Sequence, residues 1–363
     1  MNVRVTKANG FTLIEALIAT VVSVIILGAV VGVFKSTSDT NRVTLLRADV
    51  QQDARGALNL INRDLSQASA GVPPFGIPVP PKALFACGPT QCYLGGITYP
   101  NDILSPVTPD GTIGALGTSV ITIAYLDTTW PVTNQNLLAI GPKGGTLTVD
   151  QRNFDISGNA VAPPAGKNYA DPVVGTKVGD VLLLQNNNGA AVVTVTAVGG
   201  GGVLTLAGGD PLLFNVPGAL RIADPKTGFT LDPKTGVLVP PTVASRINIV
   251  TYFVSTLPQF APNGVPVLMR QVSAHPAVPV VEGVQNLQFT YDIFDSANLA
   301  GGPNGTYTSA LPANLVTNAS LIRKINMSLT LRAKAKDPQG NLHTLTINSS
   351  VSPRDLSFSD RYQ

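Results

Sequence analysis

The sequence that decides the fold is Gly10-Phe11-Thr12-Leu13-Ile14-Glu15, which is followed by a run without charge over Ala16–Phe34. A helix needs about 17–25 predominantly apolar residues to cross the hydrocarbon core of a bilayer, so this run is long enough to span one. Arg4 and Lys7 precede the run, and no comparable basic cluster follows Lys35. This asymmetry favours a cytoplasmic N-terminus. The sequence therefore predicts a single-pass helix in the inner membrane, with the rest of the chain outside.

The leader differs from a secretory signal peptide in the position of its small residue. A secretory signal has its cleavage site after the apolar region, whereas Gly10 lies before it. Cleavage after Gly10 would retain the apolar helix and free an α-amine on Phe11, one helical turn from Glu15. A carboxylate near the membrane costs about 2.5–3.5 kcal/mol on insertion scales, and the amine of a neighbouring copy would neutralise it. The alternative is a plain signal anchor in which Glu15 is incidental.

These residues resemble the processing site of type IV pilins and of type II secretion pseudopilins, position by position from Gly10 to Glu15. The resemblance implies cleavage by prepilin peptidase between Gly10 and Phe11, N-methylation of Phe11, and Glu15 as the carboxylate used in assembly. It implies as partners the prepilin peptidase, other major and minor pilins, and the assembly platform of the inner membrane.

The membrane helix is expected to continue as an amphipathic one. Apolar residues recur at steps of three and four from Val43 to Ala68, with Asp53 and Asp64 among the polar residues assigned to the other faces. Gly71 and the prolines after it should end the helix, so residues 11–70 are expected to form one helix of roughly 90 Å.

Later segments carry a second resemblance. They are similar to PilW-type minor pilins, and the two segments in the helix are also similar to the related J-type pseudopilins of type II secretion. A solvated helix face with a core stripe explains the periodicity of the two helix segments equally well, and only their particular residues favour the family. These segments are Asp49–Arg55, Asn62–Ala68, Val280–Tyr291, Ile325–Leu331 and Ser352–Leu356. The resemblance covers residues 1–70 and about 245–358, and leaves the middle of the chain unassigned.

The composition predicts an extracytoplasmic, β-rich body. Charged residues make up 12% of the chain, against about 25% in typical soluble domains. The net charge of +3 gives little electrostatic support for sequence-independent binding of nucleic acid. Cys87 and Cys92 are close enough in sequence for a structural disulfide, which an oxidising compartment would favour. Free thiols are the alternative. A zinc site would need four ligands, and His275 and His343 lie far away in the sequence.

The order of patterns along the chain predicts an α+β fold, in which the long helix packs on an antiparallel β body. Residues 71–118 are rich in proline and glycine and are interpreted as a connection that carries the disulfide loop. From residue 119 to 363 the signals are strands separated by turns, and residues 145–222 are expected to form an inserted β module. The expected strands are Ser119–Leu126, Thr146–Asp150, Asp180–Gln185, Ala191–Val198, Val203–Ala207, Ile247–Ser255, Val267–Val272, Asn286–Asp292, Ile325–Ala335 and Leu342–Val351.

The motifs of the chain do not indicate an enzyme or a cofactor. The repeated Asp224–Gly228 and Asp232–Gly236 have the Asp-Pro chemistry of turns rather than that of a phosphate-binding loop. Asp292 and Asp295 are interpreted as solvent-facing, with a calcium or catalytic role as the alternative. The hypothesis is a minor pilin that primes a type IV pilus or lies at its tip, first in the inner membrane and then on the cell surface. The alternatives are a tip-borne adhesin or DNA-uptake module, with an unknown surface or DNA ligand, and a type II secretion pseudopilin.

Overall fold

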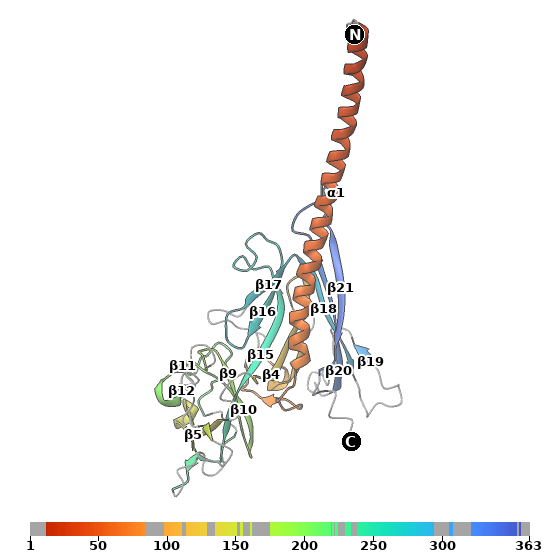
Figure 1. Ribbon diagram of the computed structural model, residues 1–363. Coiled ribbons are helices and arrows are strands. Elements are labelled where there is room, and N and C mark those ends of the chain that lie inside the picture. Colours follow the sequence, from red (N-terminus) through yellow and green to blue (C-terminus); the bar gives the residue numbers. More distant parts are fainter. Residues whose placement is uncertain are drawn as a thin grey trace, which may run out of the picture. The chain divides into compact units, whose positions relative to one another are not determined.

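The computed structural model shows one long helix followed by antiparallel strands, which confirms the expected α+β class (Figure 1). It describes residues 12–84, 98–110, 114–128, 135–150, 153–154, 160–161, 175–218, 220, 222–223, 229–233, 238–293, 305–307, 321–353 and 356. The contacts divide the chain into two units, Met1–Gln52 with Arg332–Thr344, and Asp53–Leu331 with Leu345–Gln363. The first unit holds the apolar part of the helix, and the second holds most of the strands.

Helix α1 covers Leu13–Gln67, which is 55 residues or about 82 Å of helix. It ends before the predicted glycine because Ser69 already adopts a left-handed backbone conformation, with φ 75°. The Ser69 amide then donates to the carbonyl of Ala124 at 3.0 Å. Gly71 follows with φ 69°, and a Cβ at this position would lie 2.7 Å from Cβ of Leu126. The chain therefore leaves the helix in close contact with the first long strand.

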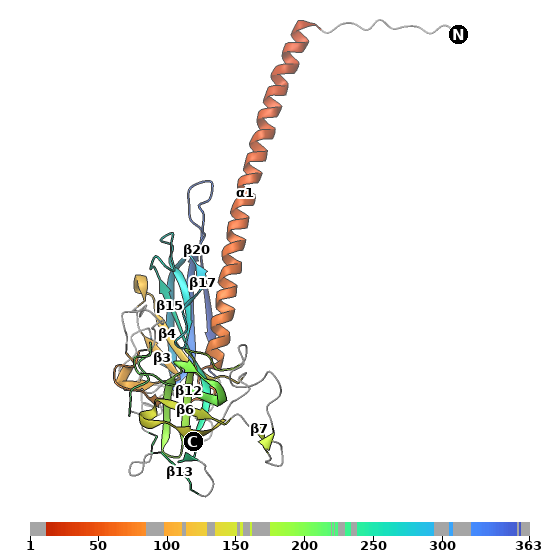
Figure 2. The ribbon, with the colours of Figure 1, turned by 90° about the vertical axis from the view of Figure 1, so that its left-hand side faces the viewer.

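The larger sheet has eleven strands among the described residues, and the longest of them is β15 (Val243–Ser255). It pairs antiparallel with β4 (Val120–Leu126), β5 (Gln135–Ile140), β9 (Val181–Asn186) and β16 (Val267–Val272). Strand β4, which lies between β15 and β3 in this sheet, can be followed in Figure 2. The sheet is completed by β3 (Val107–Asp110), β6 (Thr146–Val149), β10 (Gly189–Thr194), β11 (Ala197–Val198), β12 (Val203–Thr205) and β17 (Val278–Glu282).

A second sheet has the order β19-β18-β20-β21. Its strands are β19 (Gly305–Tyr307), β18 (Val284–Ile293), β20 (Ile322–Arg332) and β21 (Thr344–Val351). The small elements are the strand pairs β1 (Ile77–Pro78) with β2 (Ile103–Leu104), β7 (Asn153–Phe154) with β8 (Ala160–Val161), and β13 (Thr230–Leu231) with β14 (Leu238–Val239), and the 3-10 turns η1 (Pro100–Asp102), η2 (Ala115–Gly117), η3 (Pro142–Gly144) and η4 (Gly200–Gly202).

Each strand segment expected from the sequence contains a strand, but several strands were not expected. Strands β5 and β17 were missed, and β1, β2 and β3 lie in the stretch 71–118 that was interpreted as a connection. Within 145–222, β6 pairs with β5 and β9 pairs with β15, so these strands continue the larger sheet. The boundary of an inserted module there stays a prediction.

The second unit buries two apolar clusters and one face of the helix. The first cluster includes Phe253, Met269 and Leu104, and the second includes Leu182 and Leu204. The helix contributes small and branched side chains that are almost fully buried, namely Ala54, Ala57, Leu58, Ile61 and Leu65. This face has the spacing of three and four residues that the sequence predicts for an amphipathic helix.

Candidate functional site

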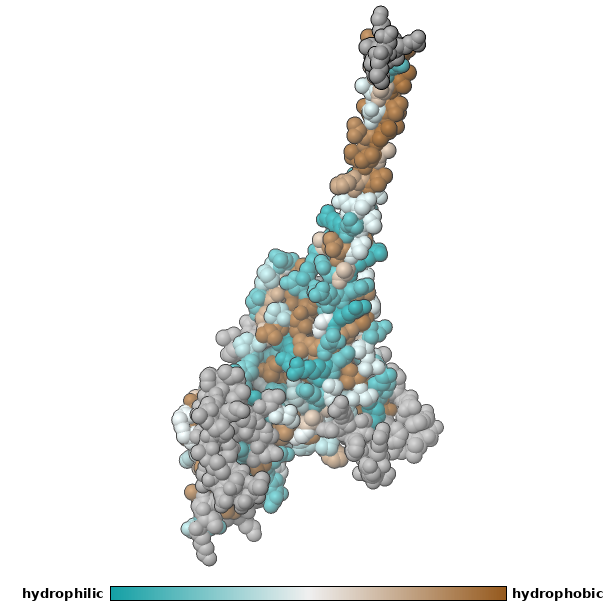
Figure 3. Space-filling model, in the orientation of Figure 1, coloured by the Kyte–Doolittle hydropathy of each residue, from teal (hydrophilic) through white to brown (hydrophobic). Residues whose placement is uncertain are grey.

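The N-terminal half of α1 carries a continuous apolar surface. Every residue from Leu13 to Phe34 is exposed, and fourteen of them are large hydrophobic residues. Figure 3 shows this surface as the brown part of the helix. A protein in water does not normally expose apolar residues contiguously over such a length. By length and composition, α1 is the one helix of the described chain that could cross a membrane.

Glu15 closes the N-terminal end of this helix. Its Oε2 accepts hydrogen bonds from the backbone N–H of Thr12 at 3.1 Å and from the Thr12 hydroxyl at 3.0 Å. The Glu15 amide in turn donates to Oγ1 of Thr12 at 3.4 Å. This reciprocal arrangement is a capping box, which satisfies amides that otherwise lack partners at the start of a helix. In the single chain, the carboxylate is therefore already engaged by its own helix terminus.

The capping box adds to the role expected for Glu15 and does not test that role. Gly10 and Phe11 lie outside the described residues, so the pairing of the Phe11 amine with Glu15 of another copy stays a prediction. Cys87 and Cys92 also lie outside the described residues, and their disulfide likewise stays a prediction. The Thr-x-x-Glu signature of the cap was present in the sequence and could have been recognised there.

The C-terminal half of α1 carries a buried carboxylate, Asp64, which is 2% exposed. Its Oδ2 lies 2.7 Å from Nε of Arg270 and accepts the hydroxyl of Tyr252 at 2.6 Å. Its Oδ1 accepts the hydroxyl of Tyr125 at 3.4 Å. These four residues, named the Asp64 cluster here, join the helix to β4, β15 and β16. The sequence pattern places Asp64 on a polar face of the helix, and this prediction is wrong because the side chain is buried against the strands.

The electrostatics of the Asp64 cluster shift the pKa values of its two tyrosines and of its arginine. Burial, together with the neighbouring Asp64 charge, raises the pKa of Tyr125 to about 12. The same two causes raise the pKa of Tyr252 well above its usual range. Burial alone would lower the pKa of Arg270, but its hydrogen bond and charge pairing with Asp64 outweigh burial and raise it. Both tyrosines are therefore neutral donors, and Arg270 is a cation.

A second polar contact joins α1 to the smaller sheet. The side-chain amide of Asn62 donates to Oγ of Ser349 on β21 at 2.9 Å, and the Ser349 hydroxyl lies 3.1 Å from Oδ1 of Asn62. Since Asn62 and Asp64 are near neighbours on the helix, the two contacts fix the same turn against both sheets. The helix is thus attached to the body at its C-terminal end by directional bonds as well as by apolar packing.

The remaining candidate residues that the structure describes do not converge on a catalytic or metal site. His275 Nε2 lies 2.8 Å from Oδ1 of Asp180, and His343 Nε2 lies 3.2 Å from Oδ2 of Asp337. Asp292 accepts the Asn326 amide at 2.9 Å, and Asp295 is outside the described residues. Within the described ranges, there is no group of three or more His, Cys, Asp or Glu residues that could hold a metal ion.

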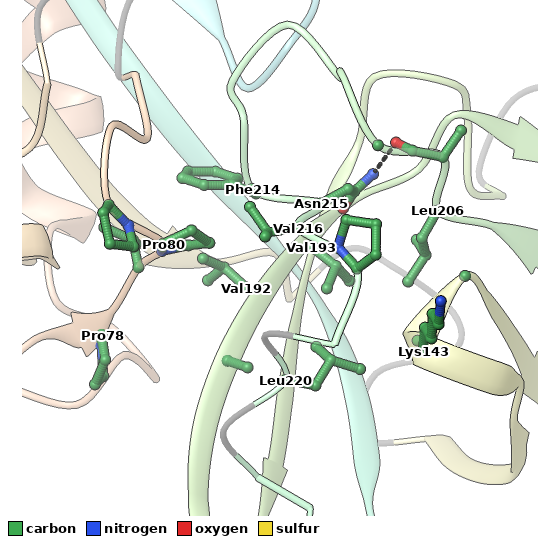
Figure 4. Close-up of a pocket in the computed structure, with 18 of the residues that line it drawn as sticks. Pro78, Pro80, Lys143, Val192, Val193, Leu206, Phe214, Asn215, Val216 and Leu220 are labelled. Carbon is green, nitrogen blue, oxygen red and sulfur yellow. Dashed lines mark hydrogen bonds between the residues drawn. The ribbon is translucent and has the colours of Figure 1, made fainter.

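The second unit also contains a pocket of about 320 Å³ beside strand β10 (Figure 4). Val192 and Val193 form part of its lining, with Phe214 and Leu220 on the surrounding segments and Lys143 on η3. The side chain of Asn215 is held by the backbone of Thr194, because its Nδ2 donates to the carbonyl of Thr194 at 2.6 Å. The pocket is therefore mostly apolar, with a single basic side chain in its lining.

Comparison with known proteins gives one informative match. The chain is 33% identical over 88 residues to the pilin-like protein PilA3 of Thermus thermophilus, and the match covers 22% of this chain. It covers 38% of PilA3, so the chain spans little more than a third of that relative's length. No family model and no solved structure matches the chain. This similarity and the exposed apolar helix together support a type IV pilin-like protein.

Proposed function

We propose that the chain is a minor pilin of a type IV pilus, of the PilW type. Prepilin peptidase cleaves it between Gly10 and Phe11, Phe11 is N-methylated, and the subunit primes assembly or lies at the tip. The observation that supports this most directly is the uninterrupted exposure of the apolar half of α1. Such a surface needs either lipid or the helices of other subunits around it, and a pilin uses both in turn.

The capping box suggests how Glu15 takes part in assembly. In the single subunit, Thr12 satisfies the carboxylate through two hydrogen bonds. When neighbouring subunits pack, the Phe11 amine of another copy replaces part of this capping, and the two charges neutralise each other in apolar surroundings. An unpaired charge in that position would be costly, so the pairing sets the axial register of the subunits.

A pair of substitutions separates capping from charge pairing. Glutamine also serves as the third residue of a capping box, so Glu15→Gln should keep the helix start and lose the charge. We expect Glu15→Gln to insert into membranes normally but to be strongly depleted from sheared filaments, as Glu15→Ala should be. Thr12→Ala is the matched control, because it removes the cap's side chain and keeps the Glu15 charge.

The measurements are immunoblots of membrane and filament fractions, with the intact mass of the wild-type protein from both. A mass without residues 1–10 and with one added methyl is the expected result. Normal incorporation of Glu15→Gln into filaments would contradict the charge pairing. A full-length mass in a strain with active peptidase would contradict the processing, and a plain signal anchor would become the better explanation.

The pocket beside β10 favours a second candidate function, a binding module displayed at the tip. Deleting residues 145–222 is a poor test because β9 pairs with the central strand β15. Val216 lines the pocket and is 44% exposed, so Val216→Asp should alter the pocket with little effect on the core. If pili still form while surface attachment or DNA uptake fails, the pocket carries that activity.

A type II secretion pseudopilin is the remaining alternative, and a deletion strain that secretes normally but lacks pili would exclude it.

A further inference from the structure

A polar hairpin loop lies beside α1 where the uncharged run of the helix ends. The loop covers residues 333–343 and connects β20 to β21. At its tip, Gln339 shares a pocket with residues of α1 that extend from Gly32 through Lys35 to Val43. All of these residues belong to the same unit of the structure. The loop therefore marks a fixed level along the apolar helix.

Internal hydrogen bonds hold the loop in one shape. The amide of Ala333 donates to the carbonyl of His343 at 2.7 Å, and the amide of Asp337 donates to the carbonyl of Asn341 at 2.9 Å. The Asp337 carboxylate accepts the Asn341 amide at 2.7 Å. Burial tends to raise the pKa of Asp337, but the hydrogen bonds from Asn341 and Gln339 and the nearby His343 lower it by more. Asp337 is thus ionised and turned into the loop.

A loop of this composition cannot enter hydrocarbon. Those of its backbone groups that have no partner within the loop would lose water without gaining another partner, which is strongly unfavourable. The boundary of the hydrocarbon must then lie on the N-terminal side of the loop, near Phe34 at the end of the uncharged run. The helix rises about 28 Å from Glu15 to Phe34, close to the hydrocarbon thickness of about 30 Å. Glu15 and the loop thus mark opposite faces of the bilayer.

The exposed charges at the loop's level are mainly positive. Lys35 on the helix and Lys334 and Lys336 on the loop are exposed, whereas Asp39 is half-buried and Asp337 is buried. Lysine side chains are long enough to follow an apolar surface while the ammonium group stays at a polar boundary. Lys35, Lys334 and Lys336 are named the basic loop surface here. Lys35 directly follows the uncharged run, and the loop that carries Lys334 and Lys336 lies beside the next turns of the helix.

We propose that the basic loop surface binds the phosphate groups of anionic phospholipids in the outer leaflet of the membrane that α1 spans. This inference rests on the proposed membrane insertion of α1. As a consequence, the loop sets how deeply the subunit lies in the bilayer before assembly, because movement in either direction would take the lysines away from the phosphates. Each basic residue near an anionic surface strengthens binding by about 5-fold, so Lys334 and Lys336 together account for roughly 30-fold.

The test is hydrogen–deuterium exchange of the full chain in nanodiscs of phosphatidylcholine, with or without phosphatidylglycerol. We expect the amides of residues 333–343 to exchange several-fold more slowly when phosphatidylglycerol is present, and high salt to remove the difference. Lys334→Gln with Lys336→Gln should abolish most of the difference, and Lys336→Gln alone should reduce it. Lys82→Gln with Lys177→Gln removes the same charge from exposed body positions and should keep the difference.

The outcomes separate this inference from the proposed function. Exchange of the variants in detergent should match that of the wild type, which shows that the loop is still folded. If the amides of Ala16–Phe34 are protected in nanodiscs but residues 333–343 exchange equally in both lipids, the inference is wrong and the membrane anchor stands. If Ala16–Phe34 itself exchanges freely, membrane insertion fails, and the proposed function fails with it.

Discussion

Replacing Arg270 by methionine should destabilise the body by about 3–5 kcal/mol, the cost typical of breaking a buried ion pair by removing one partner. The cost of breaking a buried ion pair applies here because the Asp64 side chain is only 3% exposed and that of Arg270 is 20% exposed. Methionine has a similar length and cannot pair with Asp64, so the carboxylate would stay buried without a cation. Tyr252→Phe, which removes only the 2.6 Å hydrogen bond to that carboxylate, should cost about 1.5–3 kcal/mol.

The assay is denaturant unfolding of the full chain in mild detergent, followed by the near-ultraviolet circular dichroism of its 8 tyrosines. A double-mutant cycle provides the control, because Asp64→Asn combined with Arg270→Met leaves no unpaired charge. We expect the double variant to be more stable than Arg270→Met alone, which would give a clear coupling energy. The circular dichroism spectra of the folded variants should stay close to that of the wild type.

The reasoning would be refuted by a small effect of the single substitution. Solvent-exposed ion pairs contribute about 0.2–1 kcal/mol. A loss in that range for Arg270→Met would mean that water reaches Asp64 in the folded protein. Equal losses in Arg270→Met and in the double variant would mean that the charge of Asp64 is irrelevant. In either case, the helix would be held to the body by apolar packing alone.

Three further predictions concern the same region. In the folded protein the pKa of Tyr125 is raised to about 12, from a usual value of about 10. Its contribution to the stability of the fold is therefore complete below about pH 10 and is lost as the pH rises through about 12. Absorbance titration of tyrosine with parallel unfolding measurements checks this. Gly71→Ala should destabilise by about 1–3 kcal/mol, because φ is positive and Leu126 lies within 2.7 Å of the new Cβ. Gly56→Ala has open space around it and should stabilise α1 by about 1 kcal/mol, as thermal unfolding of both variants would show.

Local patterns predicted the helix and most of the long strands. The uncharged run and the later steps of three and four residues gave α1, but not its end, because a serine rather than a glycine takes the first left-handed position. Strand β17 was missed because Pro279 interrupts its apolar pattern, and β5 because Gln135–Ile140 has a mixed one. These errors arise where tertiary contacts override local preference.

The part of the candidate site formed by residues close together in the sequence could be predicted, and the part formed by distant residues could not. The cap at Glu15 needs only residues three apart and was readable from the sequence. The Asp64 cluster was not, because Tyr252 and Arg270 lie 188 and 206 residues away along the chain. The position of Asp64 between Ile61 and Leu65 on the buried stripe was the only local sign. Polar residues on an otherwise apolar stripe need a partner, but a single sequence does not identify which one.

The exposed apolar surface of the first half of α1 also restricts how a subunit can pass from the bilayer into a filament. Fully hydrating its fourteen large apolar side chains would cost about 1.5–3 kcal/mol for each one, which is tens of kcal/mol in total. Many of these residues are β-branched, and helices of that composition are weak in water without tertiary support. A subunit that enters a filament from the bilayer would therefore exchange lipid for neighbouring helices turn by turn. The helix would stay folded and dry throughout, and assembly would have to start within the membrane.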